Sequence, residues 1–169
     1  MNLIELCEKY KAHKFSYCLE VYEQVFAPLS NKPIKLLEIG IQNGGSLKAW
    51  QEYFPNGSIF GIDIDKKYCT QSNHFCGSQS DLLFLSNVLE KIGTLDIIID
   101  DGSHHNCDQQ TSFNFLFPKM SNNGIYAIED MHDNRPEFFS NGYVHTKDWI
   151  KNMSERTHVV QDIGFIYKN

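Results

Sequence analysis

The stretch that most limits how this chain can fold is a strand, a glycine turn and the start of a helix at residues 34–50, IKLLEIGIQNGGSLKAW. The apolar run from Ile34 to Ile39, with Glu38 as its one charge, is typical of a parallel strand covered on both faces. Ser46 is a candidate N-cap for the helix that follows. The turn contains three glycines, Gly40, Gly44 and Gly45. Such a turn lets a ligand approach the backbone closely, and its free N–H groups suit a nucleotide or a carboxylate.

The spacing of these glycines separates two kinds of nucleotide site. The chain has G-x-x-x-G-G with Glu38 two residues before the first glycine, whereas a dinucleotide fingerprint has G-x-G-x-x-G. A second strand pattern begins at Ser58 and reaches Asp63 about 20 residues beyond the turn, where a carboxylate can bind both ribose hydroxyls of a nucleoside. The segment resembles the E-x-G-x-x-x-G motif of class I methyltransferases that use S-adenosylmethionine. We therefore expect a nucleoside cofactor at this turn.

Strand and helix patterns alternate along the rest of the chain, which is typical of a doubly wound α/β sheet. Residues 1–30 form a helical lead-in with two apolar helical patterns. Further strands are expected at 58–63, 74–77, 95–101 and 124–130, with helices at 80–90, 106–120 and 146–153 and two closing strands within 157–169. We predict a single domain over residues 1–169 with a Rossmann-like, mainly parallel seven-stranded sheet that ends in an antiparallel pair.

Composition excludes several classes of partner. A net charge of −6, without a basic cluster, argues against nucleic acid or an anionic membrane as the partner. No window approaches the about 18 apolar residues of a membrane span, and the N-terminus lacks a signal-peptide cleavage site. The five cysteines form no C-x-x-C pair, so reduced thiols and a cytoplasmic protein without a membrane span are expected.

Carboxylates follow the fourth and fifth predicted strands. Asp101 closes the fourth strand within IIIDDGSHH, and Glu129 and Asp130 close the fifth within IYAIEDMH. If those strands are neighbours, they lie about 4.8 Å apart, and the three carboxylates converge at one edge of the sheet. Such a set repels itself unless protons or a cation intervene, which favours a hard divalent ion such as Mg²⁺. The alternative is that these acids cap the following helices and lie apart in solvent.

A histidine lies beside this carboxylate set. His104 follows Asp101 by three residues in a glycine turn, and an imidazole accepts a proton near neutral pH, which suits a general base. His105 and His132 compete for the same role. A metal-ligand role for any of the three is less favoured, because carboxylates select a hard ion.

The motifs together resemble one family, the metal-dependent sugar O-methyltransferases of macrolide tailoring, together with the cephalosporin hydroxylase-like group that shares their fold. The match runs from CEKYKAHKFSYCLEVYEQVFAPL through LLEIGIQNGGSLKAW, GIDID, GSQSD and IIIDDGSHH to IYAIEDMH. The resemblance implies Mg²⁺ ligands at Asp101, Glu129 and Asp130 and a base at His104. It also implies S-adenosylmethionine contacts, with the methionine end near Glu38, Gly40 and Ser46, the ribose at Asp63, the adenine near Gln79, and Gly44 and Asp100 in the same site.

The function implied is metal-assisted methyl transfer from S-adenosylmethionine to a hydroxyl of a sugar or glycosylated small molecule. A hydroxylase or oxidoreductase on the same fold and a non-catalytic cofactor-binding module are the alternatives. Many relatives carry Asp-Lys where this chain has His13-Lys14, so the resemblance assigns no role over the cofactor to Lys14 and Tyr17. The macrolide enzymes also have an extra domain or long insertions, so the acceptor's identity does not carry over. The aromatic segment within residues 131–149 fits an acceptor lid and a contact in a homo-oligomer equally well.

Overall fold

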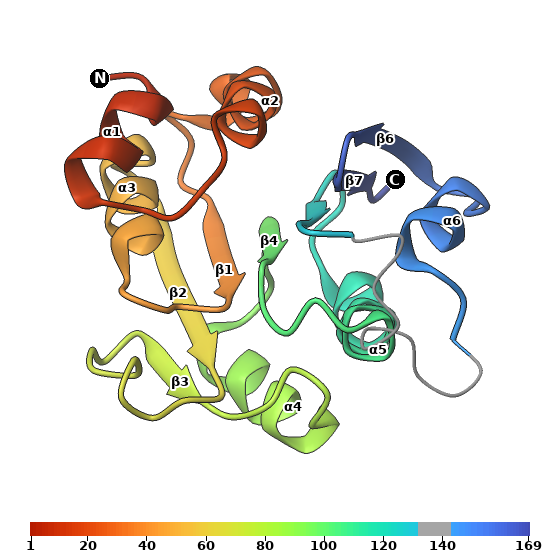
Figure 1. Ribbon diagram of the computed structural model, residues 1–169. Helices are drawn as coiled ribbons and strands as arrows, with labels where there is room; N and C mark the ends of the chain where they lie inside the picture. Colours follow the sequence, from red (N-terminus) through yellow and green to blue (C-terminus); the bar gives the residue numbers. More distant parts are fainter. Residues whose placement is uncertain (132–142) are drawn as a thin grey trace.

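The computed structural model describes residues 1–131 and 143–169 as a sheet with helices on both faces (Figure 1). The strands are β1 Lys35–Ile39, β2 Ser58–Asp63, β3 His74–Cys76, β4 Ile97–Asp100, β5 Ile125–Ile128, β6 Arg156–Val160 and β7 Ile163–Tyr167. The helices are α1 Leu3–Tyr10, α2 Ser16–Phe26, α3 Gly45–Tyr53, α4 Leu82–Ile92, α5 Asn106–Leu116 and α6 Thr146–Lys151, with short 3-10 turns at Ala27–Leu29 and Phe117–Lys119.

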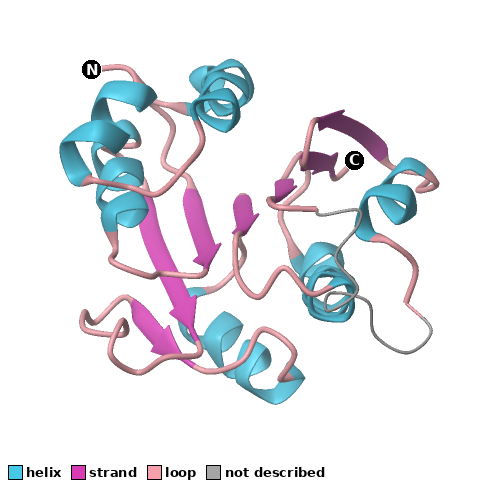
Figure 2. Cartoon of the chain, in the orientation of Figure 1, coloured by secondary structure: helices cyan, strands magenta, loops and turns pink. Residues whose placement is uncertain are grey.

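The strands form one seven-stranded sheet in the order β3-β2-β1-β4-β5-β7-β6. β1 to β5 run parallel to one another, and β7 pairs antiparallel with both β5 and β6. Figure 2 shows the strands as the central layer between helices. The predicted Rossmann-like, mainly parallel sheet with a closing antiparallel pair is therefore confirmed.

Apolar side chains cover both faces of this sheet, which is why its central strands are almost continuously apolar. On one face, α1, α2 and α3 pack over strand residues such as Leu36 and Ile99. On the other face, α4, α5 and α6 pack over alternate residues such as Leu37 and Ile98. Among the described helices, none is long and apolar enough to cross a membrane.

The start of α3 differs from the prediction. Gly44, at φ +71°, is the N-cap, and the helix begins at Gly45, so Ser46 lies inside the first turn and is not the cap. The Ser46 hydroxyl instead donates a 2.6 Å hydrogen bond to Glu38. As an N-cap, the hydroxyl would accept a hydrogen bond from a backbone N–H group. Here it donates to a carboxylate instead, and hydrogen bonds to carboxylates are shorter and stronger than those between neutral groups.

The register of the central strands sets the position of the site. Ile39 of β1 aligns with Asp100 of β4, and Asp100 aligns with Ile128 of β5. The residues that follow these three strands therefore leave the sheet side by side at one edge, where ligands bind in open α/β sheets. The β1–β4 boundary is also where the strand order reverses.

Part of the aromatic segment lies outside the described residues, including His132, Phe138 and Phe139. Trp149 is described, and its ring packs edge-on against Phe113 with centroids 5.1 Å apart. Trp149 is partly buried and packs against the core cluster on that face.

Candidate functional site

The glycine turn after β1 lies directly against the turn after β4. Gly40 has φ +96°, and a Cβ placed on it would lie 2.1 Å from the carbonyl oxygen of Asp101. Asp63, at the end of β2, accepts hydrogen bonds from the backbone N–H groups of Ile41 at 2.9 Å and Gln42 at 3.1 Å. The ends of β1, β2 and β4 thus contact one another, and the turn after β4 leaves no space for a side chain at position 40.

Two cavities open at this edge and share Gly40, Asp63 and Gly102 in their walls. The first, about 250 Å³, is polar and is lined by residues that include Lys14, Ser46, Asp101, His104 and Asp130. The second, about 140 Å³, is mainly apolar and is lined by residues that include Ile39, Ile62, Ile64, Ser78 and Gln79. A polar compartment beside an apolar one suits an elongated ligand with a charged end and an aromatic end.

Asp100 and Gln79 form a buried network beneath the second cavity. Gln79 donates to both carboxylate oxygens of Asp100 at 3.0 and 3.1 Å and accepts from the Ser103 N–H at 2.8 Å. Ser112 and Tyr126 donate to the same carboxylate at 2.7 and 3.2 Å. Since Asp100 is fully buried, the geometry favours a role in positioning Gln79 over direct contact with a ligand.

The burial of Asp100 has a consequence for stability. Burial raises the pKa of Asp100 from 3.8 to about 6, although hydrogen bonds from Ser112, Gln79 and Tyr126 partly oppose the shift. Between these two values the folded state binds more protons than the unfolded state, so the free energy of unfolding falls as pH rises. At 1.36 kcal/mol per pKa unit the full shift corresponds to about 3 kcal/mol, of which about 2 kcal/mol is lost between pH 4 and 7.

Urea denaturation of the wild type and Asp100→Asn across this pH range tests the prediction. Every other titrating group is common to both proteins, so the difference between the two curves isolates Asp100. The wild type should lose more stability than the variant as pH rises. Parallel curves would contradict the prediction.

A lysine from the lead-in lies among three carboxylates at the edge of the sheet. Lys14 Nζ lies 3.1 Å from Glu38 Oε1, 2.9 Å from Asp101 Oδ2 and 2.6 Å from Glu129 Oε1, and its side chain is fully buried. Tyr22 donates a 2.8 Å hydrogen bond to the same oxygen of Glu129. Burial disfavours the ammonium, but the three carboxylates outweigh it and hold the pKa of Lys14 well above its usual range. Burial and repulsion by Asp101 raise the pKa of Glu129.

Glu38 belongs to this buried set and lies behind the wall of the polar cavity. Ser46, Trp50 and Lys14 surround its carboxylate, and it is fully buried. Any effect of Glu38 on a ligand therefore passes through Ser46 and Lys14, which do line the cavity.

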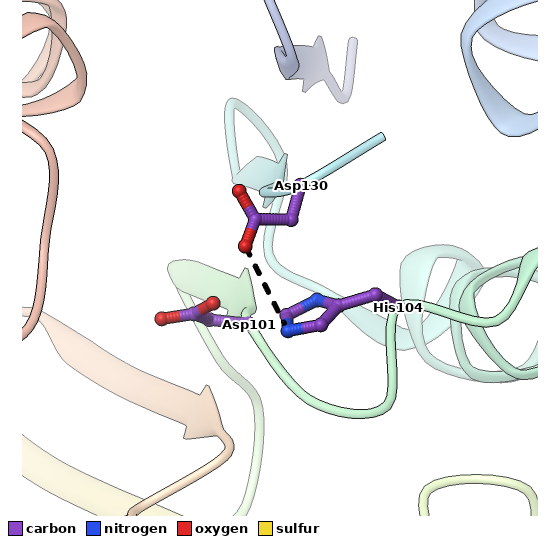
Figure 3. A group of neighbouring side chains, drawn as sticks. All are labelled: Asp101, His104 and Asp130. Atoms are coloured by element: carbon purple, nitrogen blue, oxygen red, sulfur yellow. Dashed lines mark ion pairs between the residues drawn. The ribbon is translucent and has the colours of Figure 1, made fainter. Parts of the chain in front are cut away.

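A second cluster, of two acids and a histidine, lines the polar cavity. Asp101, His104 and Asp130 each offer a ligand atom within 4.8 Å of the others, and His104 Nε2 lies 3.8 Å from Asp130 Oδ2 (Figure 3). His104 and Asp130 have φ angles of +60° and +51°, in the left-handed region. Non-glycine residues reach this region rarely, and such strain is concentrated at functional sites.

The predicted site residues thus divide into separate groups. Asp101, His104 and Asp130 come together, whereas Glu129 turns inward to Lys14 and Tyr22. His105 is the N-cap residue of α5 and does not line the polar cavity. Gly44 lies in the wall of a neighbouring cavity behind the turn.

The sequence did not predict that Lys14 and Tyr22 would contact the carboxylates at this edge of the sheet. The available signal was one of three lysines in the helical lead-in, and it does not by itself identify distant carboxylates as partners.

The link between the two lead-in helices, residues 11–15, closes one side of the polar cavity. The Lys11 carbonyl accepts a 3.1 Å hydrogen bond from Asn43, and a Cβ on Gly45 would lie 2.6 Å from the Tyr10 carbonyl. His13 and Lys14 then line the cavity. The lead-in is therefore part of the site as well as part of the core.

A glycine turn after β1, an acid at the end of β2 and acids after β4 and β5 of such a sheet define the Rossmann-like class I methyltransferase fold. The MycE methyltransferase of the mycinamycin biosynthetic pathway, in complex with Mg and SAH, superposes with a TM-score of 0.88 and 30% identity, covering 100% of this chain and 54% of that chain. Its complex with Mg, SAH and Mycinamycin VI gives a TM-score of 0.87 and 31% identity, covering 100% of this chain and 55% of that one.

Curated relatives narrow the class to sugar O-methyltransferases. The chain is 46% identical over 121 residues to 8-demethyl-8-(2-methoxy-alpha-L-rhamnosyl)-tetracenomycin-C 3'-O-methyltransferase of Streptomyces olivaceus, covering 66% of this chain and 31% of the relative. It is 38% identical over 143 residues to Mycinamicin VI 2''-O-methyltransferase of Micromonospora griseorubida, covering 77% of this chain and 36% of the relative. No protein-family model matches. The chain is a homologue of these sugar O-methyltransferases, and the resemblance drawn from its motifs is confirmed; the match spans about a third of their length.

Proposed function

We propose that this chain is an S-adenosylmethionine-dependent O-methyltransferase domain that methylates a hydroxyl of a sugar or glycosylated small molecule. The observation that carries the proposal is the convergence of Asp101, His104 and Asp130 in a cavity walled by the glycine turn and Asp63. The homologous sugar O-methyltransferases support both the reaction and the class of acceptor.

The two cavities support the cofactor assignment. The methionine end of S-adenosylmethionine fits the polar cavity beside Gly40 and Ser46, and adenine fits the apolar cavity beside Ile64 and Gln79. Asp63 borders both cavities, which suits a ribose between them. The carboxylate of Asp63 has four lone-pair sites and accepts hydrogen bonds from the N–H groups of Ile41, Gln42 and Asp65, so it retains capacity for a hydroxyl. SAH in the complex with MycE supports the same cofactor here.

The acids at this edge fit a divalent cation. The inner set of three carboxylates, Glu38, Asp101 and Glu129, is paired with a single ammonium, that of Lys14. Asp130 adds a fourth carboxylate beside Asp101. Oxygen donors in excess of the available positive charge are what Mg²⁺ prefers. We propose that Asp101 and Asp130 hold the ion. Glu129, the third ligand expected from the motif, would have to reach it with the oxygen that Lys14 does not bind.

The chain's own residues then supply proton transfer and orientation. His104 takes the proton of the acceptor hydroxyl while that oxygen forms its bond to the methyl carbon and the carbon–sulfur bond breaks. Asp130, 3.8 Å from His104 Nε2, stabilises the imidazolium that results. A divalent ion held at Asp101 and Asp130 supplies positive charge that lowers the pKa of the acceptor hydroxyl. Orientation of the acceptor accounts for part of the about 7–11 kcal/mol available from proximity.

The alternatives receive less support. A hydroxylase of the two-histidine, one-carboxylate type needs a second histidine, and in residues 1–131 and 143–169 the cluster contains one histidine and two carboxylates. A non-catalytic module would leave the strained backbone at His104 and Asp130 without a role. The negative charge supports a small-molecule acceptor over nucleic acid, and five free cysteines support a cytoplasmic location.

Calorimetric titration of S-adenosylmethionine into the purified protein, once with Mg²⁺ and once with chelator, tests the proposal. We expect binding at one site in both buffers, because the cavities that fit the cofactor are built mainly by the glycine turn and Asp63. Mg²⁺ should be required for methyl transfer more than for cofactor affinity. Absence of binding in both buffers would overturn the cofactor assignment and the proposed function with it.

A further inference from the structure

The buried ammonium of Lys14 is not used by the reaction proposed above. It lies within 3.1 Å of carboxylates from three consecutive strands of the sheet, Glu38 in β1, Asp101 after β4 and Glu129 after β5. A lysine side chain is rarely buried completely, and removing a cation from water is costly unless it is paired. The position between these carboxylates therefore strongly prefers a cation.

Lys14 also determines which carboxylate oxygens remain for other ligands. It binds Oδ2 of Asp101 and Oε1 of Glu129, and Tyr22 donates to that same oxygen of Glu129. Asp101 takes part in both clusters, because it also lies within 4.8 Å of ligand atoms of His104 and Asp130. The two clusters are therefore adjacent cation positions that share one carboxylate.

We propose that Lys14 is a built-in cation that fills the inner position, between Glu38, Asp101 and Glu129. It thereby positions Asp101 for a divalent ion at the outer position, between Asp101, His104 and Asp130. The inference rests on the proposed function for the outer ion, whereas the inner position follows from the contacts of Lys14 itself. In this arrangement, the amine restricts the acidic centre to a single divalent ion. Removing the amine opens the inner position, with its three carboxylates, to a second ion.

The test counts ions bound by protein alone, with Mn²⁺ as the probe and free Mn²⁺ measured by electron paramagnetic resonance. Lys14→Met removes the charge and keeps most of the side-chain volume. We expect it to bind one more Mn²⁺ per chain than the wild type. Lys14→Met combined with Glu38→Gln restores the net charge of the inner set, at a carboxylate not proposed as a ligand of the divalent ion, and should bind as many ions as the wild type.

Lys9→Met is the matched control, because it removes an exposed lysine of the same lead-in that pairs with Glu52 at 2.6 Å. Its ion count should equal that of the wild type. An equal count in Lys14→Met and the wild type overturns the inference.

Loss of the buried charge lowers stability, so Lys14→Met should unfold at a temperature roughly 10 °C lower in chelator. Mn²⁺ should then raise the unfolding midpoint of Lys14→Met by more than that of the wild type, since it replaces the missing cation. An equal rise in both proteins overturns the inference. If the variant is unfolded in chelator, failure of Mn²⁺ to restore its folding overturns it. No methyl donor is present in these measurements, so failure of the proposed function appears separately, as loss of cofactor binding by the wild type.

Discussion

Gly40→Ala should abolish cofactor binding and lower the free energy of unfolding by about 4 kcal/mol or more, a loss reached only by severe backbone or core defects. The added Cβ would lie 2.1 Å from the Asp101 carbonyl oxygen and 3.2 Å from Gly102 Cα, at a φ of +96°. These contacts are backbone atoms, which cannot move aside as a side-chain end can. The turns after β1 and β4 would have to separate, and they form the walls of both cavities.

Gly44→Ala is the matched control in the same turn. Gly44 also has a positive φ, +71°, but the nearest atom to a Cβ there is 4.0 Å away. Only the backbone strain remains, which costs about 1–2 kcal/mol. Urea denaturation and calorimetry with S-adenosylmethionine measure both variants. Similar losses in the two variants would show that strain, and not the approach of the Asp101 turn, limits position 40.

His104→Ala should reduce methyl transfer by 10²–10⁴-fold, the typical contribution of a general base, while S-adenosylmethionine affinity stays within about twofold. The imidazole lines the polar cavity beside Asp130 and lies outside the apolar cavity proposed for adenine. Transfer is measured with labelled S-adenosylmethionine and a sugar acceptor identified by screening with the wild type.

His105→Ala is the control for this variant, because His105 is the neighbouring residue and does not line the polar cavity. Its turnover should remain close to that of the wild type. Undiminished transfer by His104→Ala, or a larger loss in His105→Ala, would show that the base was assigned to the wrong residue.

The order of strands and helices was predictable because each central strand is a continuous apolar run followed by turn residues. β1, β4 and β5 are buried on both faces, and such runs leave little choice of element. The helix starts were less predictable. Tertiary contacts decided them, as at Ser46, whose hydroxyl bonds to Glu38 and leaves Gly44 as the N-cap.

The acidic edge was predicted, but its division into two groups was not. Glu129 and Asp130 follow β5, and Asp130 has a left-handed φ of +51°; Glu129 faces Lys14 while Asp130 faces His104. A motif of two adjacent acids does not say which of them faces the cavity. Lys14 was missed as a member of the centre because its partners lie far away along the chain.

That separation has a consequence for how the site assembles during folding. The hydrogen bond from Lys14 to Glu129 joins residues 115 positions apart, and the bond to Asp101 joins residues 87 apart. Contacts between residues far apart in the sequence form late in folding, because closing the long intervening loop costs entropy before the contact contributes any stability. The contact of Lys14 with Glu129 therefore forms only after β5 has paired with β4. The polar cavity, which Lys14, Asp101 and Asp130 line together, therefore takes its final form only when the native structure is complete.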